Sequence, residues 1–148
     1  MIRHSPRDRG SAALELVIIA PGLLLVLAVI IFAGRVAIAQ QAVDSAAADA
    51  ARSASIARTQ GAASGAAQSA ATSSLANQGL RCVTTGTVVD TSGFASPVGT
   101  PAFITATVTC VVDLTDLGAP IPGTRSVTAT VRSPLDTCLL YTSDAADE

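Results

Sequence analysis

The pattern of apolar and polar positions divides the chain into three regions. Residues 16–34 form an uninterrupted apolar run without a charged side chain. At about 1.5 Å per residue, a helix of this length can cross the hydrocarbon core of a membrane. An Ala-rich region follows to residue 79, and apolar and polar residues then alternate in several segments up to residue 132. The pattern predicts an α+β protein, in which a long N-terminal transmembrane helix continues into a small antiparallel β-sheet head.

The Ala-rich region is predicted to extend the first helix beyond the membrane to about Arg58, because alanine is the best helix former. Apolar residues recur along it at steps of seven, four and three, which forms one narrow stripe. The small side chains permit close packing, either against neighbouring subunits or against the chain's own sheet. Asp49 and Arg52, on the polar side, are spaced to pair. The stripe consists of Val36, Val43, Ala47, Ala50, Ala54 and Ala57.

Glycines at positions 61 and 65 interrupt the helical pattern. Residues 66–77 are predicted to form a second, weaker helix, with Gly79 as its C-terminal stop. The serine and glycine content leaves a flexible linker open as an alternative for this segment.

Three segments after Gly79 are predicted to be strands: residues 81–89, 102–114 and 126–132. Turn residues separate them, as expected for an antiparallel sheet with one apolar face. That face requires a cover, and the Ala-rich helix is the nearest apolar surface. The inward side chains are expected to be Ile104, Ala106, Val108, Cys110, Val112 and Leu114, with Val127, Ala129 and Val131.

The cysteines allow a register to be chosen for the first two strands. If Val88 stands opposite Ile104, Cys82 stands opposite Cys110 on the apolar face. A disulfide between them would stabilise the head by about 3–4 kcal/mol in the chain-entropy model. The alternative is two free thiols in a reducing compartment, which an exported head argues against.

Charge at the two ends of the apolar run predicts its orientation. Three arginines precede the run, whereas Arg35 and then aspartates follow it, so the N-terminus is expected in the cytoplasm and the remainder outside. A cleaved secretory signal is the competing interpretation, but the run is long for one and no small-x-small site closes it. The expected organisation is a cytoplasmic leader at 1–10, a transmembrane helix at 11–35, an exported helical region at 36–79 and an exported β region at 80–137.

The last eleven residues, 138–148, are interpreted as a sequencing artefact. They back-translate into one reading frame of a transposase adapter used in library preparation. A genuine flexible, acidic terminus is the alternative. The chain carries nine basic and eleven acidic residues, a net charge of −2. Three of those acidic residues lie in the tail, so without it the charge is 9 − 8 = +1.

Composition argues against several classes of function. A net charge near zero gives no case for nucleic-acid binding. The one histidine, His4, lies in the predicted leader, so the exported part can form no Ser-His-Asp or Cys-His arrangement. Two strand cysteines without a nearby histidine do not make a zinc site. We therefore expect no enzymatic activity, no metal, no cofactor and no small-molecule substrate.

The segment where the leader meets the apolar run carries a recognisable motif. Residues 9–16 read Arg-Gly-Ser-Ala-Ala-Leu-Glu-Leu, which resembles a type IV prepilin signal: a Gly before the cut and a Glu fifth in the mature chain. The chain as a whole resembles the TadE-like pseudopilins of tight-adherence pilus systems, especially the high-GC actinobacterial kind. Further matching segments are residues 21–22, 34–36 and 41–52, the Cys-containing hairpin, and residues 127–131 and 133–136.

The resemblance implies a minor pilin-like protein that acts in pilus assembly or initiation, sits in the cytoplasmic membrane with its head outside, and can enter the pilus. A prepilin peptidase would cut between Gly10 and Ser11. Glu15 would then meet the new N-terminal amine of a neighbouring pilin or pseudopilin, which offsets the cost of burying its carboxylate. Ser11 departs from the aromatic or Met that begins most major pilins, which puts N-methylation in doubt. The alternative function is a generic single-pass, membrane-anchored exported binding module.

Overall fold

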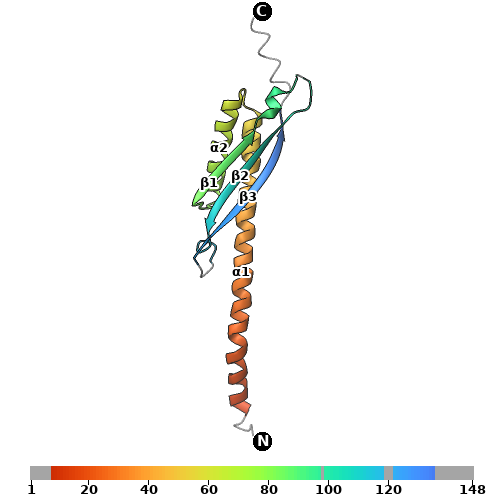
Figure 1. Ribbon diagram of the computed structural model, residues 1–148. Helices are drawn as coiled ribbons and strands as arrows, with labels where there is room; N and C mark the ends of the chain where they lie inside the picture. Colours follow the sequence, from red (N-terminus) through yellow and green to blue (C-terminus); the bar gives the residue numbers. More distant parts are fainter. Residues whose placement is uncertain (1–7, 98, 119–121, 136–148) are drawn as a thin grey trace, which may run out of the picture.

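The computed structural model describes residues 8–97, 99–118 and 122–135, and for residues 8–14 it describes only the backbone. A single long helix carries a small α+β head at its C-terminal half (Figure 1). The predicted fold class, a long N-terminal helix followed by a small antiparallel sheet, is confirmed. Residues 1–7 of the predicted leader (1–10) and the tail at 138–148 lie outside the described residues, while residues 8–10 belong to α1. The elements are α1 (Asp8–Ser55), α2 (Gln60–Asn77), β1 (Thr84–Asp90), the 3₁₀ helix η1 (Ser92–Ala95), β2 (Phe103–Asp113) and β3 (Thr124–Pro134).

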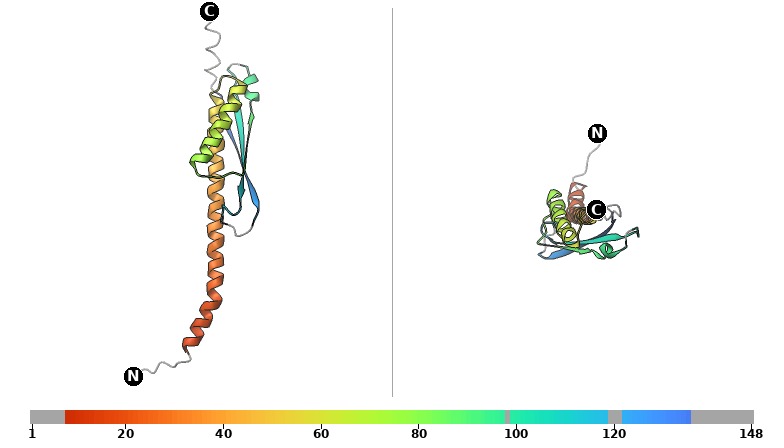
Figure 2. Two further views of the ribbon diagram at one scale, coloured as in Figure 1. Left: turned by 90° about the vertical axis from the view of Figure 1, so that its left-hand side faces the viewer. Right: turned by 90° about the horizontal axis from the view of Figure 1, so that it is seen from above.

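Helix α1 is continuous over 48 residues, about 72 Å at 1.5 Å per residue. It begins three residues before the predicted start at Ser11 and ends close to the predicted end at Arg58. Pro21 lies inside it, and the helix curves toward its N-terminal end (Figure 2). A proline removes one backbone hydrogen bond and bends a helix without having to end it.

Helix α2 begins six residues earlier than predicted, so the expected break at Gly61 to Gly65 is wrong. The Oγ1 atom of Thr59 accepts a hydrogen bond from the amide of Ala62 at 3.2 Å and caps the N-terminus. This cap, together with packing against α1, outweighs the roughly 1 kcal/mol that each helical glycine costs. The predicted stop at Gly79 is confirmed, because Gly79 adopts φ +70° and the amide of Leu80 donates to the carbonyl of Leu75 at 3.1 Å.

The three strands form an antiparallel sheet in the order β1-β2-β3, and both helices cover the same face of it (Figure 2). Strand β3 runs alongside α1 in the same direction. Gln40 Nε2 donates to the carbonyl of Thr128 at 3.4 Å, and near the far end Ser133 Oγ lies 3.1 Å from Ser55 Oγ. The turn between β2 and β3 therefore lies at the end of the head that is nearest to the first half of α1.

The core between helices and sheet is built largely from alanine on the helical side. Four members of the predicted apolar stripe are fully buried, and Val36 and Ala57 pack against the core from its margin. Small side chains allow α1 to lie close to both α2 and the sheet. Of the two interpretations of the stripe, packing against the chain's own sheet is therefore the one that the structure shows. The buried alanines are Ala39, Ala42, Ala46, Ala47, Ala50, Ala51, Ala54, Ala63, Ala67, Ala71, Ala102, Ala106 and Ala129.

The predicted register of β1 against β2 is wrong. Val88 pairs with Thr107 rather than Ile104 and its side chain is 70% exposed, while Val89 and Thr87 point toward the core. The pattern could not distinguish the two registers, because both faces of β1 carry valine and threonine. The second and third strands do present the predicted residues inward.

The Cys82–Cys110 disulfide is nevertheless present, with the two Cα atoms 5.3 Å apart. Extended without interruption, the β1 register would place Asp113 opposite Cys82, on the outer face. The amide of Val83 instead donates to the carbonyl of Val111, which is already the partner of Thr84. Two residues opposite one form a β-bulge, and the extra residue turns Cys82 back toward the core.

The observed register leaves the Oγ1 atom of Thr87 buried without a hydrogen-bond partner. We expect Thr87→Val to stabilise the head by about 1 kcal/mol, because an apolar isostere removes the cost of burying an unpaired hydroxyl. Thermal unfolding of the full chain in detergent micelles measures this. Thr107→Val is the matched control on the outer face, where Thr107 Oγ1 lies 3.0 Å from Thr130 Oγ1. A lower melting temperature for Thr87→Val than for this control would contradict the inward orientation.

Candidate functional site

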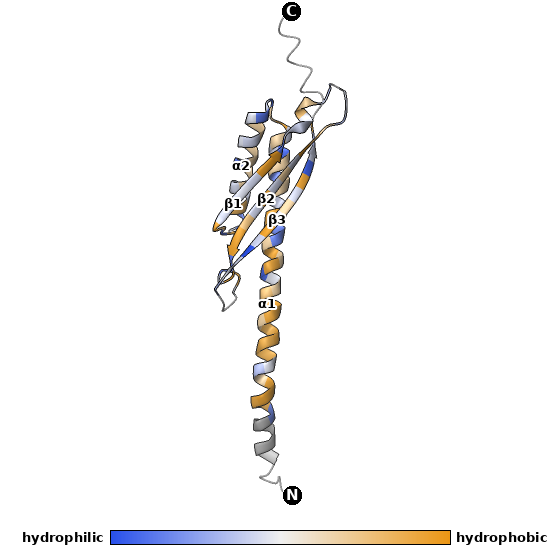
Figure 3. Cartoon of the chain, viewed as in Figure 1, coloured by the Kyte–Doolittle hydropathy of each residue, from blue (hydrophilic) through white to orange (hydrophobic). Residues whose placement is uncertain are grey.

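The first half of α1 projects from the head as a bare apolar shaft, which we define as residues 15–34 (Figure 3). Its large aliphatic side chains from Leu16 to Ile31 are exposed by 52–71%, whereas Phe32 is half-buried against the head. Soluble proteins rarely expose an apolar surface of this extent, because contact of apolar side chains with water is unfavourable. This helix is long and apolar enough to cross a membrane. The exposed residues are Leu16, Val17, Ile18, Ile19, Leu23, Leu24, Leu25, Val26, Leu27, Val29, Ile30 and Ile31.

Glu15 lies at the N-terminal end of the shaft and its side chain is exposed. Gly10 and Ser11, five and four residues earlier, lie in the first turns of the same helix, where the backbone alone is described. The structure thus places the predicted cleavage point and the predicted partner-binding carboxylate on one helix, outside the head. Within a membrane, an exposed carboxylate at this position requires a partner that the shaft itself does not supply.

Where the shaft enters the head, Arg35 holds the turn that follows β2. Its Nη1 atom donates to the carbonyl oxygen of Asp116 at 3.2 Å. The turn is also ordered by Asp113, whose Oδ1 atom accepts hydrogen bonds from the Oγ1 atom and the amide of Thr115 at 2.7 and 2.8 Å. These bonds, the hydroxyl first, lower the pKa of Asp113 below its ordinary value. Sequence reasoning did not anticipate this contact, because Arg35 and Asp116 are 81 residues apart.

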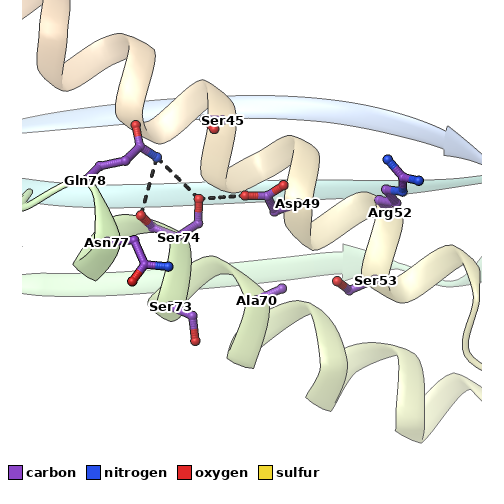
Figure 4. A pocket seen from close by; sticks show the side chains of 9 residues that line it. All are labelled: Ser45, Asp49, Arg52, Ser53, Ala70, Ser73, Ser74, Asn77 and Gln78. Carbon is purple, nitrogen blue, oxygen red and sulfur yellow. Dashed lines mark hydrogen bonds between the residues drawn. The ribbon is translucent and has the colours of Figure 1, made fainter.

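A polar groove of about 480 Å³ separates α1 from α2 (Figure 4). Ser74 Oγ donates to Asp49 Oδ2 at 2.7 Å, and Gln78 Nε2 donates to the carbonyl of Ala42 at 3.3 Å. Asp49 is therefore bonded to α2 and not paired with Arg52 as predicted. These bonds fasten α2 to α1. The groove is lined by Ser45, Asp49, Arg52, Ser53, Ala70, Ser73, Ser74, Asn77 and Gln78.

The groove contains hydroxyl, amide, guanidinium and carboxylate groups, but its lining includes no histidine, cysteine or lysine. A serine hydroxyl needs an adjacent base to become a nucleophile, and Ser74 donates its proton toward a carboxylate that is tied to the helix pair. In the described part of the chain, no group of three or more His, Cys, Asp or Glu side chains is placed to hold a metal ion. The hydrogen bonds at the groove hold the two helices together, whereas the exposed shaft is long and apolar enough to cross a membrane.

Comparison with known proteins places the sequence similarity on this same helix. Residues 10–52 match the family model described as TadE-like protein. The match begins at the predicted cleavage residue Gly10, covers Glu15 and the whole shaft, and ends near the C-terminus of α1. The resemblance to the TadE-like family is confirmed over this range. Neither a curated protein nor a solved structure is significantly similar to the chain.

Proposed function

We propose that this chain is a minor pilin-like subunit of a tight-adherence pilus assembly or secretion system, because residues 10–52, which include the shaft, match the TadE-like family model. The TadE-like family is associated with such pili, and an apolar N-terminal helix suits a membrane-anchored component. The single observation that carries the proposal is the coincidence of the family match with the helix that the head leaves bare.

The proposed mechanism assigns separate tasks to the two halves of α1. The C-terminal half forms the core of the head, so its apolar stripe is already covered. The shaft alone remains free to pack with the corresponding helices of other pilins or pseudopilins. With the N-terminus in the cytoplasm and the head outside, the shaft waits in the membrane until assembly begins.

Processing by a prepilin peptidase between Gly10 and Ser11 is the step that would activate the shaft. It creates an α-amino group at Ser11, one helical turn from Glu15 in the sequence. The amine of one subunit and the Glu15 carboxylate of its neighbour then form a pair inside the membrane, where opposite charges attract strongly. Glu15 is exposed on the isolated subunit and therefore available for this contact.

The N-terminal residue of the protein, extracted from the membrane of its native host, tests the proposal. We expect a mature chain that starts at Ser11, which mass spectrometry of the intact protein or Edman degradation detects. Gly10→Leu should block the cut and leave the full-length chain in the membrane, while Gly22→Leu, in the shaft, should be processed normally. A wild-type chain that still starts at Met1 or Ile2 would refute processing.

A generic membrane-anchored binding module is the second candidate, since the family match ends at residue 52 and the sheet lies beyond it. In that case the shaft is a plain signal anchor and the head carries the function. Retention of the unprocessed N-terminus together with normal piliation after deletion of the gene would favour this candidate.

A further inference from the structure

The end of the head nearest to the shaft combines arginines, exposed apolar side chains and an ordered turn. We call this end the foot and define it by Arg35, Ile38, Arg81 and residues 114–118. Arg35 donates to the carbonyl of Asp116, and a Cβ atom added to Gly118 would lie 3.8 Å from Cδ of Arg35. The turn after β2 is therefore in contact with the helix at the point where the apolar run ends.

The depth of the foot follows from helix geometry. Phe32 belongs to the apolar run, yet its side chain is half-buried against the core of the head. Nineteen residues, 16–34, extend about 28 Å as a helix, and a membrane hydrocarbon core is about 30 Å thick. The run matches the thickness of the hydrocarbon core closely, so its C-terminal end is expected at the boundary of that core. The part of the head that reaches Phe32 must then lie at the level of the lipid headgroups.

The side chains of the foot are suited to the headgroup layer of a membrane. The side chain of Ile38 is 67% exposed, and that of Val83, next to the foot, is 62% exposed. A cleft of about 170 Å³ opens beside Ile38 and is lined by Arg35, Ile38 and Asp116, among others. The guanidinium group of Arg35 is exposed and carries five N–H donors, of which the contact with Asp116 uses one. Arginine binds phosphate through paired donors, while an adjacent apolar side chain suits the upper acyl chains.

Any attraction between the foot and a lipid headgroup must come from individual side chains rather than from the net charge of the foot. The carboxylate of Asp116 lines the clefts of both Arg35 and Arg81, so the foot as defined carries only a small positive net charge. Ser and Thr side chains, which dominate the rest of the sheet surface, recognise no lipid group strongly. The cleft beside Arg35 is where a cation, unused donors and apolar surface coincide.

We propose that the foot is a membrane contact, in which Arg35 binds the phosphate of a phospholipid in the leaflet next to the head. This contact sets the height of the head on the bilayer. It requires only that the shaft spans the membrane and does not depend on the role of the protein in a pilus.

Tryptophan fluorescence tests the depth of the foot in the bilayer. The chain contains no native tryptophan, so a single introduced tryptophan reports on its own position. Thr124→Trp places the indole group at the exposed start of β3, opposite Asp113, and Ala95→Trp places it in η1 at the other end of the sheet. The 11 residues of β3 separate these ends by about 33 Å, at about 3.3 Å per step. In phosphatidylglycerol vesicles with a nitroxide on the headgroups, we expect strong quenching of the first variant and almost none of the second. Equal quenching of both, or none of Thr124→Trp, would overturn the proposal.

Binding of the lipid phosphate is tested with the same Thr124→Trp protein in vesicles of a galactosyl diacylglycerol, a lipid that has no phosphate. A few per cent of spin-labelled phosphatidylglycerol should quench about fivefold more effectively than the same amount of spin-labelled galactolipid, as expected for one arginine near an anionic lipid. Arg35→Gln should remove this preference and leave the depth unchanged, while Arg132→Gln, near the other end of the sheet, should retain it. Equal quenching by the two lipids with Arg35 in place would refute phosphate binding.

Discussion

Replacing Glu15 with leucine is expected to leave the protein anchored in the membrane and to abolish pilus assembly. Leucine extends the apolar shaft by one residue, and a carboxylate costs up to about 2.5–3.5 kcal/mol in a membrane helix, so insertion can only be favoured. The proposed pair with the α-amino group of a neighbour is lost, however. Removal of one partner from a buried ion pair costs about 3–5 kcal/mol, a factor of roughly 150 to 4,000 in the affinity of each contact.

Gene replacement in the native host allows both effects to be measured, by membrane fractionation and by counting sheared pili in electron micrographs. Glu15→Gln keeps the shape of the side chain without its charge and should fail as Glu15→Leu does. Glu15→Asp keeps the charge and should retain part of the piliation. Val17→Leu, two residues further along the same shaft, serves as the matched apolar control and should assemble normally. Normal piliation of Glu15→Leu would remove the basis for the proposed role of this carboxylate.

Loss of the Cys82–Cys110 disulfide is expected to have the largest effect on stability. The bond closes a loop with a sequence separation of 28 residues, which corresponds to about 3.6 kcal/mol in the chain-entropy model. A head of about 100 residues changes its melting temperature by roughly 4–8 °C for each kcal/mol. We therefore expect Cys82→Ala/Cys110→Ala to melt about 15–25 °C below the wild type, measured by circular dichroism of the full chain in micelles.

The third cysteine supplies the control. Cys138 lies in the tail that we interpret as an artefact, and Cys138→Ser should leave the melting temperature unchanged. Treatment of the wild type with a reductant should reproduce the effect of the double variant. The choice of alanine matters because Cys110 is fully buried, and a serine there would add an unpaired hydroxyl to the core. Equal melting temperatures for the wild type and the double variant would show that the bond does not stabilise the head.

Strong, long patterns made most of the fold predictable. The apolar run and the alternation of β2 each extend over ten or more residues, and each pattern indicates a single type of secondary structure. The start of α2 was missed because its N-terminal cap at Thr59 is a single residue followed by two glycines that usually end helices. The register of β1 was missed because its two faces are chemically similar, and the cysteine pairing was reached through a bulge that no periodicity reveals.

In the candidate site, too, the local motifs were predictable from the sequence and the long-range contacts were not. Gly10, Ser11 and Glu15 stand out in the sequence because their spacing is local to one helix. The contact of Arg35 with Asp116 and that of Asp49 with Ser74 join residues far apart in the chain, so they depend on which turn reaches which helix. Single arginines and serines in such positions carry no pattern of their own. Their partners become visible only when the sheet is placed on α1.

The unbroken course of α1 through both membrane and head has a mechanical consequence. The shaft and the helical core of the head belong to one continuous helix, α1, so no loop between them can take up a displacement. When the shaft is drawn out of the membrane by a single helical turn, the head must rise by the same 5.4 Å or so. An axial pull on the shaft would therefore be transmitted through α1 to the head, because no loop joins the two.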